Sequence, residues 1–179
     1  FTHDNFGLWA TKDVICDVFA KSVFYTPLRF FKKELLNGLR FPEKVNFCED
    51  MIFLYQLYQK SKTIYHIEKS LYAYRENSQG ATRNIKPDYF EQMLKFYQQL
   101  LLDDRLEVSY LKVNVFYVLY RCSNELRKGL FLPLNIFIDS KKLLLKFIFS
   151  PKIVLRKKII LALPNAYSVL SSFKKRIEK

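Results

Sequence analysis

The sequence predicts a mixed α/β fold that is mostly helical and ends in a helical C-terminal extension. In several segments, apolar residues recur at i, i+3, i+4 and i+7, which is typical of helices with one buried face. Two short stretches near the middle are rich in β-branched and aromatic residues, as strands are. Half of the 179 residues are apolar, so the chain has enough material to bury a core.

Three helices are expected in the first part of the chain. Thr11 is a suitable N-cap for a helix over residues 12–20. A second, short helix is predicted for residues 28–36, ending at Asn37-Gly38. The strongest helix signal follows Glu49 and Asp50, because the next apolar residues share one face: Met51, Leu54, Tyr55 and Tyr58.

Strands are predicted for residues 63–67 and 71–75, on either side of a turn at 68–70. Two longer helices follow. Their predicted buried stripes are Phe90, Met93, Leu94, Tyr97 and Leu101 in the first, and Tyr110, Val113, Tyr117 and Tyr120 in the second. Three prolines, Pro133, Pro151 and Pro164, are then expected to divide the remainder into three short helices.

The composition excludes several classes of site. The chain has only 4 glycines and no glycine-rich phosphate loop. Cys16, Cys48 and Cys122 are odd in number and widely spaced, which favours three reduced thiols over a disulfide framework or a metal site. The chain begins with Phe1 and shows no signal peptide, so we expect it to be a piece of a longer protein.

Three stretches, taken in order, resemble the second half of a bacterial family 2 glycosyltransferase of the GT-A type. The first, at 27–36, is the basic and aromatic run PLRFFKKELL. The second joins LRFPE at 39–43 to FCEDMIF at 47–53, and it resembles the family's F-P-E and G-E-D-x-x-F block. The third runs from Ile67 through Arg75 to Thr82. Cys48 stands where the family usually has a small residue, often glycine.

The resemblance implies a partial GT-A, Rossmann-like domain that transfers a sugar from a nucleotide-sugar donor, a UDP-sugar by preference, to a glycan or lipid-linked glycan of the cell surface. It implies inversion, with Asp50 as the general base and Glu49 beside it orienting the acceptor or a neighbouring side chain. Substrate binding would fall to Arg29, Lys32, Arg75 and Ser78. The family holds a divalent metal, Mn²⁺ or Mg²⁺, through a D-x-D motif in its N-terminal half. That half is absent here, so we expect the chain alone to be inactive.

Each of these residues also has a simpler interpretation. Glu49 and Asp50 are the kind of acidic residues that stabilise a helix N-terminus. Arg29, Lys32 and Arg75 are equally compatible with solvated surface charges. Trp9 and His66 are interpreted as structural, and Asp103-Asp104 as a helix end and not a metal motif. A non-catalytic, membrane-associated helical module derived from a glycosyltransferase remains the alternative function.

The positive charge is concentrated in the last third of the chain. Residues 126–179 hold 13 lysines and arginines against 2 acidic residues, and so carry +11 of the net charge of +13. Basic helices with leucine and phenylalanine on one side lie in membrane interfaces. Two such faces are expected, one with Leu143, Leu144, Phe147 and Ile148, and one over residues 166–177. The alternative is that these helices pack on the catalytic domain.

The sequence therefore predicts three parts: a catalytic portion at 1–85, a helical hairpin at 86–128 and a basic amphipathic tail at 129–179. The expected location is cytoplasmic, on the inner face of the bacterial cell membrane, where the tail contacts anionic lipid. Nucleic acid is disfavoured as a partner because the chain has no recognised nucleic-acid motif.

Overall fold

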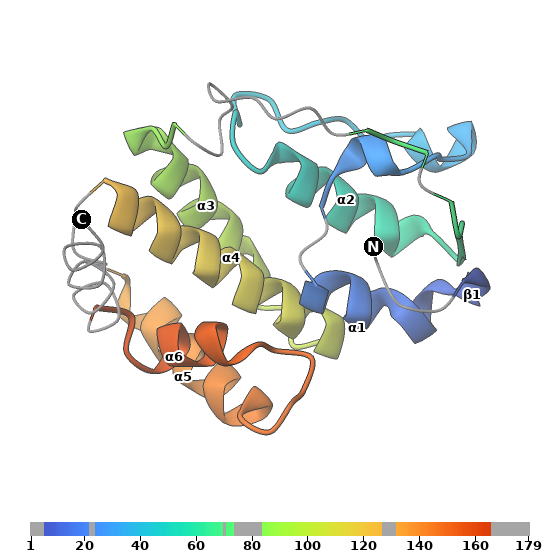
Figure 1. Ribbon diagram of the computed structural model, residues 1–179. Helices are drawn as coiled ribbons and strands as arrows, with labels where there is room; N and C mark the ends of the chain where they lie inside the picture. Colours follow the sequence, from blue (N-terminus) through green and yellow to red (C-terminus); the bar gives the residue numbers. More distant parts are fainter. Residues whose placement is uncertain (1–5, 22–23, 70, 74–83, 127–131, 166–179) are drawn as a thin grey trace. The chain divides into compact units, whose positions relative to one another are not determined.

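A computed structural model describes residues 6–21, 24–69, 71–73, 84–126 and 132–165 (Figure 1). The chain divides into two compact units, Phe1–Asn84 and Ile85–Lys179. In its coarse form, the predicted fold class is confirmed, because the described residues are mostly helical and include a small two-stranded sheet.

The sheet of the first unit joins β1 (Gly7–Ala10) to β2 (Thr63–His66) in antiparallel register, with Gly7 opposite His66 and Ala10 opposite Thr63. The prediction of a strand over residues 63–67 is therefore confirmed in substance, but its expected neighbour is wrong. Leu71–Ala73, the described part of 71–75, has no strand structure. The true partner, β1, comes far earlier in the sequence and is too short to show a clear alternating pattern.

Two of the predicted helices in this unit are confirmed. Helix α1 (Thr11–Lys21) buries Val14, Ile15 and Val18, as expected. Helix α2 (Glu49–Lys60) begins at the two acidic residues and buries Met51 and Leu54. The start of α1 is fixed to the end of α2, because the Thr11 hydroxyl donates to Ser61 over 3.2 Å and the Thr11 amide donates to Lys62 O over 2.9 Å.

The single helix predicted for 28–36 is wrong. The segment instead forms two 3₁₀ turns, η1 (Thr26–Leu28) and η2 (Lys33–Leu36), with Arg29 and Lys32 in extended conformation between them. Neither turn buries a residue, and Phe30 is 86% exposed, so an α-helix here would gain no stabilisation from packing. The end of the segment is as predicted, since Gly38 has a φ of 73° after η2.

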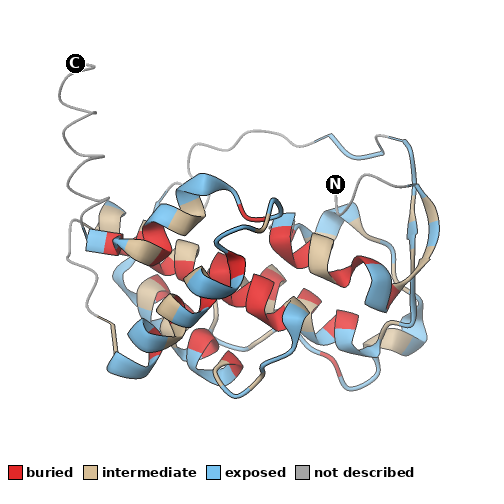
Figure 2. Ribbon diagram, turned by 90° about the horizontal axis from the view of Figure 1, so that it is seen from below, coloured by how far each residue is buried: buried red, intermediate tan, exposed pale blue. Residues whose placement is uncertain are grey.

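The second unit is a set of helices around α4 (Leu106–Glu125). Helix α3 (Pro87–Leu100) packs on α4, and α5 (Leu134–Phe147) and α6 (Leu155–Ala162) also pack on α4 and on each other (Figure 1). Helix α4 is buried around most of its circumference (Figure 2). It is therefore the core element of this unit.

The predicted stripes of the two long helices need correction. Helix α3 buries Tyr89, Met93, Phe96, Tyr97 and Leu100, so its buried face is centred away from Phe90 and Leu94. Of the predicted α4 stripe, Tyr110, Val113 and Tyr120 are buried and Tyr117 is only partly so. A stripe was the wrong pattern for α4, because neighbouring helices cover more than one of its faces.

The described tail helices belong to the same unit as the hairpin. Helix α5 starts directly after Pro133, and Pro151 lies in the connection to α6. Leu143 and Phe147, expected to face lipid, are buried, and the Phe147 ring stacks on Tyr110 with centroids 4.4 Å apart. The second predicted lipid-facing helix, at 166–177, lies outside the described residues. Within the described part, no helix is both long and apolar enough to cross a bilayer.

Candidate functional site

The first candidate site is the head of α2. Glu49 and Asp50 occupy its first turn, and both are partly exposed. Asp50 accepts a hydrogen bond from the Thr26 hydroxyl and a longer one, 3.4 Å, from the Thr26 amide. The carboxylate is thus fixed beside η1 by a residue 24 positions earlier.

The residue before this turn, Cys48, has an unusual backbone conformation. Its φ of 56° and ψ of 25° lie in the left-handed region, and its side chain makes no capping hydrogen bond to α2. Glycine adopts this conformation without steric cost, whereas other residues are disfavoured there. At position 48 the backbone conformation therefore favours glycine, and small side-chain size alone does not meet the requirement.

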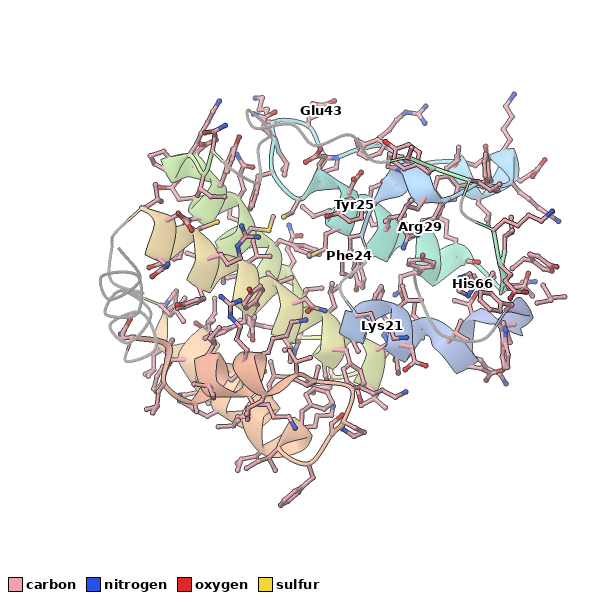
Figure 3. The ribbon with its side chains drawn as sticks, viewed as in Figure 1. Lys21, Phe24, Tyr25, Arg29, Glu43 and His66 are labelled. Atoms are coloured by element: carbon pink, nitrogen blue, oxygen red, sulfur yellow. The ribbon has the colours of Figure 1, made fainter. Side chains whose placement is uncertain are left out.

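Arg29 lies beside the same helix. Its Nε donates to the Tyr58 hydroxyl of α2 over 2.7 Å, its guanidinium also donates to Tyr25 O, and its Cζ lies 5.9 Å from the centroid of the Tyr58 ring. Figure 3 shows Tyr25 and Arg29 next to α2. Arg29 therefore connects the loop after η1 to the last turn of α2.

Aromatic contacts bring two of the three motifs together on α2. Phe41, from the F-P-E motif, stacks on Phe53 with centroids 4.2 Å apart, and Phe31 meets the same ring edge-on at 6.2 Å. The basic and aromatic run, the F-P-E loop and the acidic helix start thus form one structural cluster in the first unit.

The positions of the remaining candidate residues do not indicate a role in binding or catalysis. Lys32 is exposed and immediately precedes η2. Arg75 and Ser78 lie outside the described residues, so their role stays a prediction. His66 is on β2, with its ring 4.9 Å from Phe6, and Trp9 donates to Phe6 O over 3.2 Å. Asp103 pairs with Arg105 at 2.6 Å, and both it and Asp104 lie between α3 and α4, as a helix end should.

A second polar cluster lies inside the helical unit, and the sequence analysis did not predict it. Lys112 of α4 is 1% exposed, and its Nζ lies 3.6 Å from Asp139 of α5. The other oxygen of Asp139 accepts a hydrogen bond of 2.8 Å from the Tyr97 hydroxyl of α3. Burial, and secondarily the Asp139 charge, raises the pKa of Tyr97 well above its usual range. The cluster joins three helices.

Two further lysines reach α4 from the tail helices. Lys146 of α5 donates to the Ser109 hydroxyl over 2.8 Å, and Lys157 of α6 donates to the Asn114 side-chain oxygen. Burial lowers the pKa of Lys157 to about 8. Tail lysines that the sequence assigned to a membrane surface therefore also hold the tail on α4.

Two features of the sequence could have identified Lys112 and Asp139, because each is a charged residue in a segment of unlike character. Lys112 stands in a long apolar helix, and Asp139 is the lone acidic residue of 132–165. Charged side chains are seldom fully buried unless they are paired, so a lysine within a buried helix indicates a partner of opposite charge. Thr26 and Tyr58 carried no comparable signal, since both fit ordinary loop and helix positions.

The chemistry available among the described residues is that of carboxylates, guanidinium groups and hydroxyls. No group of three or more His, Cys, Asp or Glu side chains suited to a metal ion occurs in that part of the chain. Cys16, Cys48 and Cys122 are not joined in disulfides, and burial raises the pKa of Cys122 to about 11. We find no protein family, curated protein or solved structure that matches this chain.

Proposed function

We propose that the chain is the acceptor-side portion of a bacterial family 2 glycosyltransferase of the GT-A type, with Asp50 as the general base. The observation that carries the proposal is the cluster on α2: the first two of the three ordered motifs meet there, and Asp50, in the first turn of the same helix, is held by Thr26. In an inverting transfer, the base removes the proton of the attacking acceptor hydroxyl. A carboxylate has about four lone-pair positions, so bonds from Thr26 leave it capacity for an acceptor.

The donor in this proposal is a nucleotide sugar, a UDP-sugar by preference, and the acceptor is a surface glycan or its lipid-linked precursor. Glu49 orients the acceptor, while Arg29, Lys32, Arg75 and Ser78 bind substrate groups. A divalent metal and the nucleotide are held by residues outside this chain. The enzyme acts at the inner face of the bacterial cell membrane.

One observation favours the alternative of a non-catalytic module. Asp50 and Arg29, the two best-placed polar residues, both make contacts that hold η1 and its following loop on α2. Side chains with such structural contacts have a sufficient reason to exist without catalysis. The two functions differ in a measurable way, because only one of them transfers sugar.

The test uses the longest polypeptide encoded by the reading frame that contains this chain. It is incubated with labelled UDP- and GDP-sugars, Mn²⁺ or Mg²⁺, and bacterial membranes, and label in the glycan and lipid fractions is measured. We expect transfer from one donor class by the long polypeptide and none by the 179-residue chain. Absence of transfer from every donor favours the non-catalytic module. Micromolar binding of a nucleotide sugar by the short chain, measured by calorimetry, contradicts the proposed division of labour.

A further inference from the structure

The outward sides of α5 and α6 carry apolar residues that the core does not use. On α5, Leu134, Ile138 and Leu145 lie on the side opposite the buried Ile136, Ser140, Leu143 and Phe147. Leu134 and Leu145 are 72% and 73% exposed. Helix α5 is thus apolar on two sides, and only one of them packs against the unit.

The same feature continues along the chain into α6. Phe149 is 94% exposed in the connection, and Val154 follows it at 58%. On α6, Leu155 and Ile159 are one turn apart and exposed, whereas Ile160 and Leu161 are buried. We call the exposed set the outer face: Leu134, Ile138, Leu145, Phe149, Val154, Leu155 and Ile159. Figure 2 distinguishes the exposed from the buried residues of these helices.

Basic residues accompany the outer face, and acidic ones do not. Lys142, Lys152 and Arg156 are exposed on the same segment. Asp139 is the single acidic residue in 132–165, and its carboxylate is engaged by Lys112 and Tyr97 in the interior. The outer face therefore consists of exposed apolar side chains with basic residues near them.

The combination of exposed apolar side chains and positive charge indicates which kind of partner can bind the outer face. Large exposed apolar patches mark interaction sites with proteins or membranes. A second copy of the chain, with a net charge of +13, would bring like charges together, which opposes self-association. Nucleic acid would neutralise the positive charge, but it would not bury the exposed leucine and phenylalanine side chains. An anionic lipid surface satisfies both, through insertion of apolar groups and attraction of lysine and arginine.

We propose that the outer face of α5 and α6 is a membrane-binding surface that inserts into the interface of an anionic bilayer. Its residues differ in part from those the sequence suggested, because Leu143 and Phe147 are in the core, whereas Ile148 is 45% exposed. The inserted side chains are Leu145, Phe149 and Leu155. The surface does not depend on sugar transfer, so either proposal can fail without the other.

The test is co-sedimentation of the full chain with vesicles of phosphatidylcholine, alone or mixed with phosphatidylglycerol, at low and high salt. The outer-face variant combines Leu145→Asn, Phe149→Asn and Leu155→Asn. The matched control is Leu102→Asn, since Leu102 is 96% exposed in the same unit but is followed by Asp103 and Asp104. Circular dichroism and thermal unfolding establish that both variants remain folded.

We expect the wild type to bind mixed vesicles at low salt, and to bind less at high salt or to neutral vesicles, because salt screens the attraction. The outer-face variant should bind at least about tenfold more weakly, since three apolar side chains no longer leave water. The control should bind like the wild type. Unchanged binding by the outer-face variant, or no wild-type binding at low salt, overturns the proposal. So does dimerisation of the lipid-free chain that the outer-face variant abolishes, since a second copy would then be the occupant.

Discussion

At the scale of single residues, Cys48 shows how a motif position can be explained only by conformation. From sequence, the position before Glu49 requires a small residue, and Cys meets that description. The structure gives a different requirement, a left-handed backbone at φ 56°. A sequence lists side chains but not backbone angles, so this reason was not accessible without coordinates.

This conformation predicts an unequal response to two small substitutions. Cys48→Gly and Cys48→Ala both remove the thiol, but only glycine removes the steric cost of the left-handed region. We expect the glycine variant to be more stable than the alanine variant by about 1 kcal/mol. The measurement is the free energy of unfolding from denaturant titration. Equal stability of the two variants would show that position 48 carries no conformational strain.

At the scale of elements, the cluster of Lys112, Asp139 and Tyr97 determines how three helices fit together. We expect Asp139→Asn to lower the unfolding free energy by roughly 3–5 kcal/mol, because it leaves the ammonium of Lys112 buried without its counter-charge. Adding Lys112→Met to Asp139→Asn should recover part of the loss, since the unpaired charge is then absent.

Thermal and chemical unfolding of the two single variants and the double variant provide the test. The expected result is a double variant that is more stable than Asp139→Asn alone. If the losses of the single variants simply add, the two residues do not interact and the cluster has no role in joining α4 to α5.

Lys157 gives the α6 contact a pH dependence. Its folded pKa, about 8, is below its ordinary value of 10.5, so the unfolded chain binds more protons between these values. Stability should therefore rise as pH increases from about 8 to 10.5, by up to about 3 kcal/mol, because one pKa unit corresponds to about 1.4 kcal/mol.

The comparison that isolates this effect is unfolding of wild type and Lys157→Met across that pH range. Other groups titrate in both proteins, so only the difference between the two curves reports on Lys157. We expect the wild type to gain stability relative to the variant as pH rises. A constant difference, or one of opposite sign, would show that Lys157 is not forced into a buried position.

At the scale of the whole molecule, local patterns were more informative than long-range ones. The helices α1 and α2 and the presence of α3 and α4 followed from apolar spacing. The pairing of β1 with β2 could not be predicted, because the partners are distant in sequence. Nor could periodicity indicate which side of α5 is buried, since both Leu143 and Leu145 lie on apolar sides.

The candidate site was predictable in part. The acidic pair at the start of α2 followed from the motifs, whereas its connection to Thr26 and that of Arg29 to Tyr58 depend on tertiary contacts. The same contacts suit two purposes, since they hold η1 on α2 and are also suited to orienting a base.

The measurement that tests the central claim most directly is the turnover of Asp50→Asn beside that of Thr26→Val, in the long polypeptide with its donor. Both variants disturb the contact between η1 and α2, but only the first removes the base. We predict that Asp50→Asn lowers kcat by about 10²–10⁴-fold with donor binding retained, while Thr26→Val loses roughly 1 kcal/mol of stability and little turnover. A loss of less than about tenfold for Asp50→Asn, or equal losses in the two variants, would contradict the assignment of Asp50 as the base.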